Sequence, residues 1–355
     1  MKPINSARLL SYLLLGIRSA ASQAGKGAAA FGAPPPTWYE GADMKEDAVE
    51  KWQSYLGEAD ATGTSSLPGF NLSQPWSGAE PLDWTIKIAV KADMKSPLGS
   101  PNGESLDFVT GGSVWIEPPD GLVAAGNNIN NYTANPEWYP YVVYYSSRGL
   151  YGPAPAAPLT AFFHRNPGDK RPADGRCDGI LPDACIDSLL NAATTSGDVI
   201  DEANGPRIES MDSNVCPGIG GPWPGALGSP FNLTTRSQSN AAMKFNEGWV
   251  LSFSSELGPE GNATDYAAHG SQYVPILFRW MRNGGAGTYS ATDPKPKGPV
   301  SQLICVAVNK AAEGKSLPDP GDDYLKAVQS GEDERRSKSF LSEYGASLAR
   351  ISRLI

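Results

Sequence analysis

The segments CDGILPDACIDSLL (residues 177–190) and LICVAV (residues 303–308) decide how this chain is held together, because they contain three of its four cysteines. The first segment predicts a helix capped by Asp183. Its apolar face comprises Cys185, Ile186, Leu189, Leu190 and Ala193. The second segment is apolar on both faces, which predicts a central strand paired with the strand before it. A disulfide bond from the polar insertion around the first segment to this strand would tie the insertion back to the core of the sheet.

Four cysteines allow three pairings, and the sequence leaves the choice open. The shortest loop pairs Cys177 with Cys185, which leaves Cys216 for Cys305; this is the pairing we favour. The pairing of Cys177 with Cys216 and of Cys185 with Cys305 is nearly as good. No C-x-x-C motif and no neighbouring histidine is present, which argues against a redox or metal role for these cysteines.

Composition bounds the class of protein. A chain of 355 residues with 40% hydrophobic content can bury a full core, and 39 Gly and 31 Pro without a period indicate many turns between short elements. The net charge is −9, and there is no basic stripe, so nucleic acid is excluded as an expected partner.

The N-terminus has the pattern of a signal peptide over residues 1–24. Lys2 and Arg8 precede the apolar run of residues 9–17, and small residues follow it. A short buried helix is the alternative interpretation. The run is too short to span a bilayer, and no longer apolar span follows, so no transmembrane segment is expected. The Pro-rich residues 25–36 predict a flexible lead-in.

Four N-x-S/T sequons also indicate that the chain enters the secretory pathway. They begin at Asn71, Asn131, Asn232 and Asn262. Each lies in a polar or turn-like stretch that can carry a glycan. Together with an even number of cysteines, they predict a secreted, extracellular glycoprotein with disulfide bonds.

A helix and a loop are predicted at the start of the body. In residues 45–56 the apolar side chains share one helical face, and Gly57 ends the pattern. That face comprises Ala48, Val49, Trp52, Tyr55 and Leu56. Residues 59–81 are rich in Ser, Gly and Pro and are predicted to form a loop.

Strand patterns dominate the remainder of the body. They occupy residues 84–91, 106–117, 139–146 and 248–254. In the first of these, apolar and polar side chains alternate, as in a strand with one wet face. Gly111 and Gly112 predict a bulge or turn in the second. A last strand over residues 273–281 contains Pro275, which favours a sheet edge or a late start.

The fold class that we predict is α+β and mainly β: an antiparallel, sandwich-like sheet assembly with a few peripheral helices. The predicted organisation is a single β-rich domain at 37–310 with a polar, helix-bearing insertion at 165–225, an acidic linker at 311–335 and an amphipathic basic helix at 336–355. That helix either docks on the domain or frays, and a membrane-surface or partner-binding role is the alternative.

Catalytic signals are weak. Only His164 and His269 are available as bases, and no G-x-S-x-G motif occurs, which argues against a hydrolase triad. The Asp-rich insertion does not match a calcium loop, so we predict neither metal nor cofactor. Glycoside hydrolysis needs only two carboxylates, and the acids to examine are Glu117 and Glu247.

Each of these two acids lies close to a tryptophan, Glu117 to Trp115 and Glu247 to Trp249, which an aromatic cleft wall would require. An ordinary surface acid beside a core tryptophan is the competing interpretation. The nine tryptophans of the chain also allow a non-catalytic glycan platform, although more of them are expected in the core.

The run CDGILPDACIDSLL, the later Cys-Pro and the run NATDYAAHGSQYVPILFRW resemble uncharacterised secreted glycoproteins of filamentous fungi, over about residues 175–310. The resemblance implies a secreted fungal glycoprotein and transfers no catalytic residue. We therefore expect a non-catalytic protein that interacts with a cell wall, a host or a glycan. The partner class is a glycan or an extracellular protein, and the alternative is a carbohydrate-active hydrolase that uses a pair of carboxylates.

Overall fold

The computed structural model describes residues 46–97, 107–119, 133–147, 175–194, 199–200, 215–216, 219–222, 231–232, 234–236, 243–245, 250–255, 257–283, 294–319 and 321. Several predictions lie outside these residues: the signal peptide (1–24), the lead-in (25–36), the C-terminal helix (336–355), Asn131 and Glu247. The fold is α+β and mainly β, as predicted.

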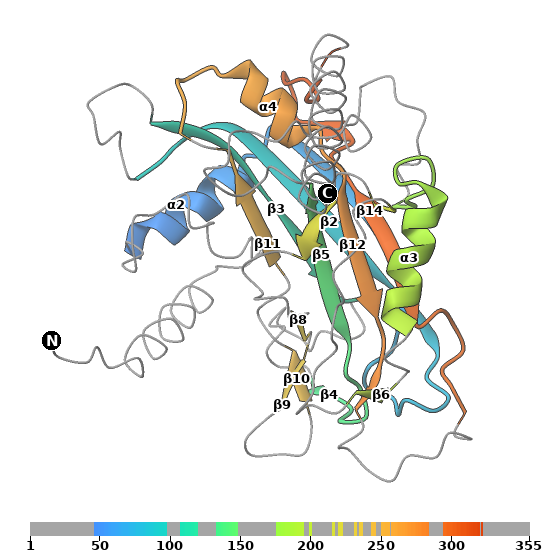
Figure 1. The fold of residues 1–355 in the computed structure, drawn as a ribbon. Helices are drawn as coiled ribbons and strands as arrows, with labels where there is room; N and C mark the ends of the chain where they lie inside the picture. The colour runs from blue at the N-terminus through green and yellow to red at the C-terminus, as the bar shows by residue number, and fades with distance from the viewer. Residues whose placement is uncertain are drawn as a thin grey trace, which may run out of the picture.

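Two antiparallel sheets form the body of the molecule (Figure 1). The first sheet has the order β11 (Val250–Ser254), β3 (Phe108–Glu117), β2 (Pro81–Lys95), β1 (Ala61–Phe70) and β15 (Lys310–Ala311). The second has the order β14 (Ser301–Val306), β12 (Val274–Arg279), β5 (Tyr141–Ser147) and β7 (Ile219–Pro222), with β8 (Phe231–Asn232) also paired to β5.

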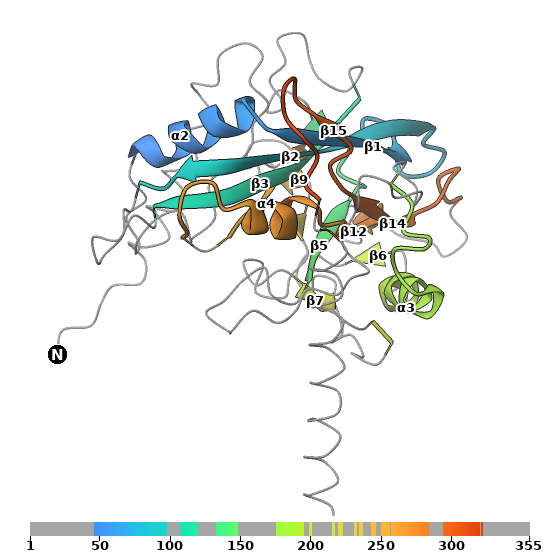
Figure 2. The ribbon, with the colours of Figure 1, turned by 90° about the horizontal axis from the view of Figure 1, so that it is seen from above.

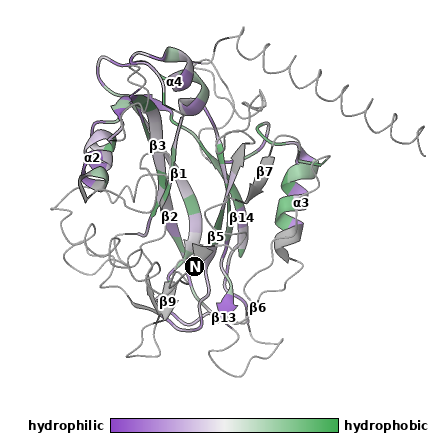
Figure 3. Cartoon of the chain, turned by 60° about the vertical axis from the view of Figure 1, so that its left-hand side comes forward, coloured by the Kyte–Doolittle hydropathy of each residue, from purple (hydrophilic) through white to green (hydrophobic). Residues whose placement is uncertain are grey.

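Smaller elements complete the described part. Strands β4 (Thr133–Ala134), β10 (Met243–Phe245) and β9 (Thr234–Arg236) form an antiparallel sheet, and β6 (Val199–Ile200) pairs in parallel with β13 (Arg282–Asn283). The helices are α2 (Glu46–Gly57), α3 (Asp183–Thr194) and α4 (Ala263–Gly270). Helix α2 covers the outer face of the first sheet and α3 that of the second, which gives four layers (Figures 2 and 3).

The central core lies between the two sheets. Strand β2 supplies Trp84, Ile86, Ile88 and Val90, the four alternating positions predicted from sequence. Residues of the second sheet, such as Tyr144 and Ile276, pack in the same cluster. The period of two along each strand therefore puts one apolar row inside the sandwich and leaves the other row for the outer face.

The prediction of a loop over residues 59–81 is wrong for its first half, although residues 71–80 do lie outside the strands. Residues 61–70 form β1, and all ten pair with β2. The strand was missed because several of its inward positions, such as Ala61, Gly63 and Ser65, carry small side chains. An added Cβ on Gly63 would overlap the carbonyl oxygen of Ala307, so the close approach of the second sheet requires a small residue there.

The pair Gly111–Gly112 makes neither a turn nor a bulge in β3, which is continuous through both residues. The irregularity lies opposite, in β2, between Lys91 and Met94. The glycines are needed for packing instead, since a Cβ on Gly112 would come within 2.6 Å of Phe253 Cζ.

Residues 303–306 of LICVAV lie in β14, which pairs with β12 as predicted, but β14 is the terminal strand of its sheet and not a central one. The backbone of residues 175–177 occupies its outer edge: Cys305 N donates to Gly175 O at 2.7 Å, and Arg176 forms a bridge with Ile304. The strand is apolar on both faces because Ile304 and Val306 pack in the core between the sheets, while Leu303 and Cys305 pack in the cluster under α3.

Strand β12 is internal, so the edge position predicted from Pro275 is wrong. Pro275 pairs with Cys305 of β14, whereas the ladder to β5 begins one residue later, at Ile276. Pro275, which has no backbone N–H, therefore lies just before the first residue that pairs with β5. The late start predicted from Pro275 is confirmed for the pairing with β5.

Both disulfide pairings considered from sequence are wrong. The bonds join Cys177 to Cys305, with a Cα–Cα distance of 5.0 Å, and Cys185 to Cys216, at 4.8 Å. The reason is the edge pairing of residues 175–177 with β14, which places Cys177 beside Cys305 although 128 residues separate them. All four cysteines are bonded, as expected.

Candidate functional site

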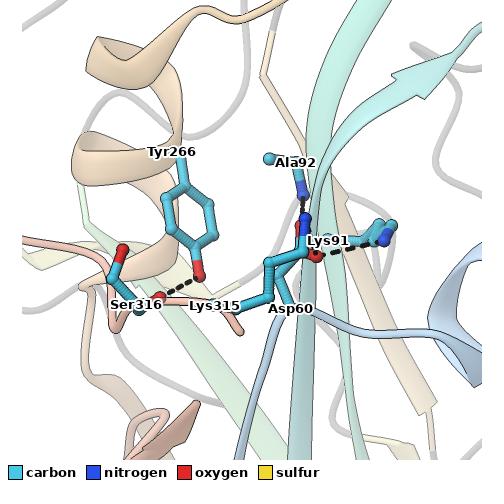
Figure 4. Close-up of polar contacts among 6 residues, drawn as sticks. All are labelled: Asp60, Lys91, Ala92, Tyr266, Lys315 and Ser316. Carbon is cyan, nitrogen blue, oxygen red and sulfur yellow. Dashed lines mark hydrogen bonds and ion pairs between the residues drawn. The ribbon is translucent and has the colours of Figure 1, made fainter. Parts of the chain in front are cut away.

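A pocket of about 370 Å³ opens where the first sheet meets the N-terminal end of α4 (Figure 4). Four segments contribute to it: the residue before β1, the irregularity in β2, the start of α4 and the segment after β15. The polar side chains that define its chemistry are Asp60, Lys91, Asp93, Asn262, Tyr266 and Lys315.

Asp60 is fixed by its backbone at the junction of three strands. Its N–H donates to Val90 O at 2.9 Å, and its carbonyl accepts from Ala312 N at 2.9 Å. The residue thus bridges β2 and the end of β15 at the point where β1 begins. Its carboxylate is also buried, with only 7% of the side chain exposed.

The Asp60 carboxylate has three cationic or N–H partners. Oδ1 lies 3.0 Å from Lys91 Nζ and 3.2 Å from Lys315 Nζ, and Oδ2 accepts from Ala92 N at 3.0 Å. Burial by itself raises the pKa of Asp60, but the Ala92 hydrogen bond and the two lysines outweigh it, so the pKa lies below its ordinary value. Asp60 is therefore ionised at neutral pH.

The irregularity in β2 forms a second wall. Asp93 has a φ of 51°, a left-handed conformation that Asp tolerates better than most residues. This conformation turns its side chain toward the loop before α4, where Oδ1 accepts from Gly261 N at 2.7 Å. The bulge thus anchors the start of α4 to the sheet.

Tyr266 closes the pocket from α4. Its hydroxyl donates to the carbonyl of Ser316 at 3.0 Å and so ties α4 to the segment after β15 (Figure 4). Burial, and secondly the negative charge of Asp60, raise the pKa of Tyr266 well above its ordinary value. The phenol therefore stays protonated.

Asn262 caps α4. Its Oδ1 accepts from Asp265 N at 3.2 Å, which satisfies one of the free N–H groups of the first turn. Because Asn262 also lines the pocket, the sequon predicted at residues 262–264 borders the pocket wall.

His269 lies at the other end of α4, and its Nδ1 is shielded from solvent without a hydrogen-bond partner among the described residues. Burial lowers the pKa of His269 to about 4. The neighbouring Gly270 is packed tightly, because a Cβ there would lie 2.7 Å from Pro318 Cγ. Helix α4 is thus packed against the rest of the chain at its C-terminal end, as well as being anchored at its start by Asp93.

Of the acids proposed from sequence, Glu117 does not line the pocket. It lies on the outer face of the first sheet, where its Oε2 is 2.6 Å from Lys87 Nζ and its Oε1 accepts from Trp115 Nε1 at 2.9 Å. Because Glu247 lies outside the described residues, the carboxylate-pair hypothesis stays a prediction.

The tryptophans that the structure describes are core residues. Trp52, Trp76, Trp84, Trp115, Trp138 and Trp280 are each at most 8% exposed. Several pack against one another with tilted rings: the ring centroids of Trp76 and Trp138 are 4.7 Å apart, and those of Trp84 and Trp280 are 5.1 Å apart. These six side chains therefore do not provide an exposed glycan platform.

The other sequons lie away from the pocket or outside the described side chains. Asn71 follows β1, and its Oδ1 accepts from Ser73 N at 3.1 Å and from Ser73 Oγ at 2.6 Å. Asn232 lies in β8. Sequence reasoning missed the pocket because its residues come from separate segments, and the sequon at Asn262 was the only local signal for it.

Neither a protein-family model, nor a curated protein sequence, nor a solved structure matches this chain. In the described ranges no helix is long and apolar enough to cross a membrane. The same ranges contain no group of three or more His, Cys, Asp or Glu side chains arranged to hold a metal ion.

Proposed function

We propose that this protein is a secreted glycoprotein that acts without catalysis, by binding a saccharide of a cell wall or host surface in the pocket between β2 and α4. The observation that carries the proposal is the geometry of the pocket, where Lys91 Nζ and Lys315 Nζ lie 3.0 Å and 3.2 Å from the Asp60 carboxylate. Asp60 stays ionised and Tyr266 stays protonated across neutral pH, so neither exchanges protons with a ligand. The Tyr266 proton is donated to Ser316 O, so the phenol oxygen remains available as an acceptor.

The chemistry of the pocket suits a polyhydroxylated ligand. Each sugar hydroxyl both donates and accepts, and here ammonium donors lie beside carboxylate acceptors and a tyrosine ring. The ammonium group of Lys315 is the most accessible of these, because its side chain is 53% exposed. The volume of about 370 Å³ falls within the range of small-ligand sites.

Secretion is supported by two kinds of feature. The N-terminal pattern and the sequons point to the secretory route, and both disulfide bonds require an oxidising compartment to form and persist. The Cys177–Cys305 bond joins residues 128 positions apart, so it links distant parts of the fold and not neighbouring turns.

The test is saccharide binding by the wild type and by Lys315→Ala. Immobilised glycans of fungal, plant and animal origin are the probes, followed by calorimetry on any saccharide retained. Lys315→Ala removes an ammonium donor from the pocket rim, and we expect binding to weaken by about tenfold, as for the loss of a charge-assisted hydrogen bond.

The matched control is Lys297→Ala. Lys297 also forms a 3.0 Å ion pair with a carboxylate, that of Glu80, and is exposed, but it lies outside the pocket. Equal losses in both variants would contradict a specific role for the pocket. Release of reducing sugar by the wild type, abolished in Glu117→Gln, would instead support the hydrolase alternative.

A further inference from the structure

The sequon Asn262–Thr264 coincides with the pocket wall. Asn262 and Ala263 both line the pocket, while Thr264 is exposed on the first turn of α4. A glycan attached here would begin at the pocket and not on a distant surface. This coincidence is independent of the protonation states of Asp60 and Tyr266.

The two side-chain atoms of Asn262 have different surroundings. Oδ1 is used in the helix cap, where it accepts from Asp265 N. Nδ2, the atom that N-glycosylation modifies, lies beside Gly258, and a Cβ on that glycine would come within 3.2 Å of it. Gly258 has no left-handed φ that would demand glycine, but a Cβ there would crowd this nitrogen and, at 3.4 Å, Asp265 Oδ2.

We propose that Asn262 carries an N-linked glycan whose first sugars lie over the pocket and control access to it. The donor is an oligosaccharide linked through pyrophosphate to a lipid. The Nδ2 nitrogen forms a bond to C1 of the first sugar and loses one proton, while the C1–O bond to pyrophosphate breaks and the pyrophosphate leaves with the electron pair. Oδ1 and one N–H remain on the amide, so the cap of α4 is retained.

The attached sugars would meet the same groups that are offered to an external saccharide. Tyr266 follows Asn262 by one helical turn on the same face of α4. Lys315 lies across the pocket, with an exposed ammonium group that can donate to sugar hydroxyls. The glycan therefore competes with an external saccharide for these groups. This control of binding rests on the proposed function, whereas the occupancy of Asn262 does not.

Asn71 provides a contrast within the same chain. It follows the last residue of β1, whereas Asp60 precedes the first. The ten residues of β1 lie between them, and eleven steps of about 3.3 Å each separate the two positions by roughly 36 Å. A glycan on Asn71 would thus lie at the opposite end of the strand from the pocket.

The experiment compares wild type, Thr264→Ala and Ser73→Ala, each secreted from a eukaryotic host. Thr264→Ala destroys the pocket sequon and leaves Asn262 and its cap intact, and Ser73→Ala destroys the distant sequon. Site occupancy is read by mass spectrometry of peptides. Pocket access is read from the rate at which acetic anhydride acetylates Lys315, with Lys297 as the internal reference.

We expect a glycan on Asn262 of the wild type, and Lys315 acetylated several-fold faster in Thr264→Ala than in the wild type or Ser73→Ala. Lys297 should react at the same rate in the wild type and Thr264→Ala; it is no reference for Ser73→Ala, because Asn71 N donates to the carbonyl of Glu80, the residue that pairs with Lys297. An unoccupied Asn262, or an equal rate at Lys315, would overturn the inference. The saccharide-binding assay on Thr264→Ala then separates the two proposals, because absence of binding by the open pocket contradicts the function and not the occupancy.

Discussion

Helix α2 covers the first sheet through packing, whereas α3 covers the second sheet with two disulfide bonds beneath it. Under α2, Ala48, Trp52 and Leu56 bury their side chains against Met94, and Trp52 Nε1 donates to Ser113 Oγ at 3.3 Å. Under α3, the apolar cluster includes the four bonded cysteines. The same sandwich is therefore sealed by a large aromatic side chain on one side and by covalent bonds on the other.

The difference arises from the side chains that each helix has available. Helix α2 leads directly into β1, and one tryptophan fills the space above the paired strands β2 and β3. Helix α3 contributes smaller apolar groups, chiefly Cys185 and Leu189, and it lies far along the chain from β14, which it covers. Covalent bonds supply in this layer the fixation that a large buried side chain supplies in the other.

Breaking the bond that anchors the α3 side should have the largest effect. Replacement of both Cys177 and Cys305 by Ala removes a cross-link over 128 residues, and the chain-entropy model gives about 5 kcal/mol for such a loop. We expect unfolding by guanidinium chloride at a much lower concentration. The double replacement of Cys185 and Cys216, 31 residues apart, should cost less, roughly 3.5 to 4 kcal/mol. The reverse order would contradict the proposed role of the long bond.

Trp52→Ala tests the α2 side in the same denaturation assay. Trp52 is fully buried, and its removal leaves a cavity over Met94 and Gly111, so we expect a loss of about 4 kcal/mol. Trp52→Phe keeps much of the volume and should lose clearly less. The disulfide bonds should form normally in both variants. A loss below about 1 kcal/mol for Trp52→Ala would show that packing does not hold this layer.

Lowering the pH should destabilise α4 and the first sheet before it destabilises the layer formed by α3. The folded pKa of His269, about 4, lies below the ordinary value of 6.5, so unfolding takes up a proton between these values. Stability is complete above pH 6.5 and falls as the pH drops toward 4, by at most about 3 kcal/mol. Asp60, whose pKa is also lowered, adds a further loss only below about its ordinary value of 3.8.

Hydrogen exchange at pH 7 and pH 4.5 provides the measurement. Amides of α4 should lose protection at the lower pH, while those of α3 keep it. His269→Gln should flatten the pH dependence of stability between pH 6.5 and 4, because glutamine does not titrate in this window. An unchanged slope in this variant would assign the acid effect to other groups.

Predictability differs between elements for a physical reason. Strand β2 and helix α2 are recognisable in the sequence because their buried side chains are large and recur with the period of the element. Strand β1 is not, since its inward positions include Ala61, Gly63 and Ser65, which resemble a loop in composition. The pocket is harder still to predict, because Asp60, Asn262 and Lys315 meet only after three distant segments pack together.

The sequence by itself determined the mainly β sandwich, the apolar faces of α2 and α3, and the participation of all four cysteines in disulfide bonds, because these depend on local period and residue type. Only the tertiary structure decided which cysteines pair, which strand forms the edge, and which sequon borders a pocket. These depend on distances between segments far apart in the chain, and no local pattern encodes such distances.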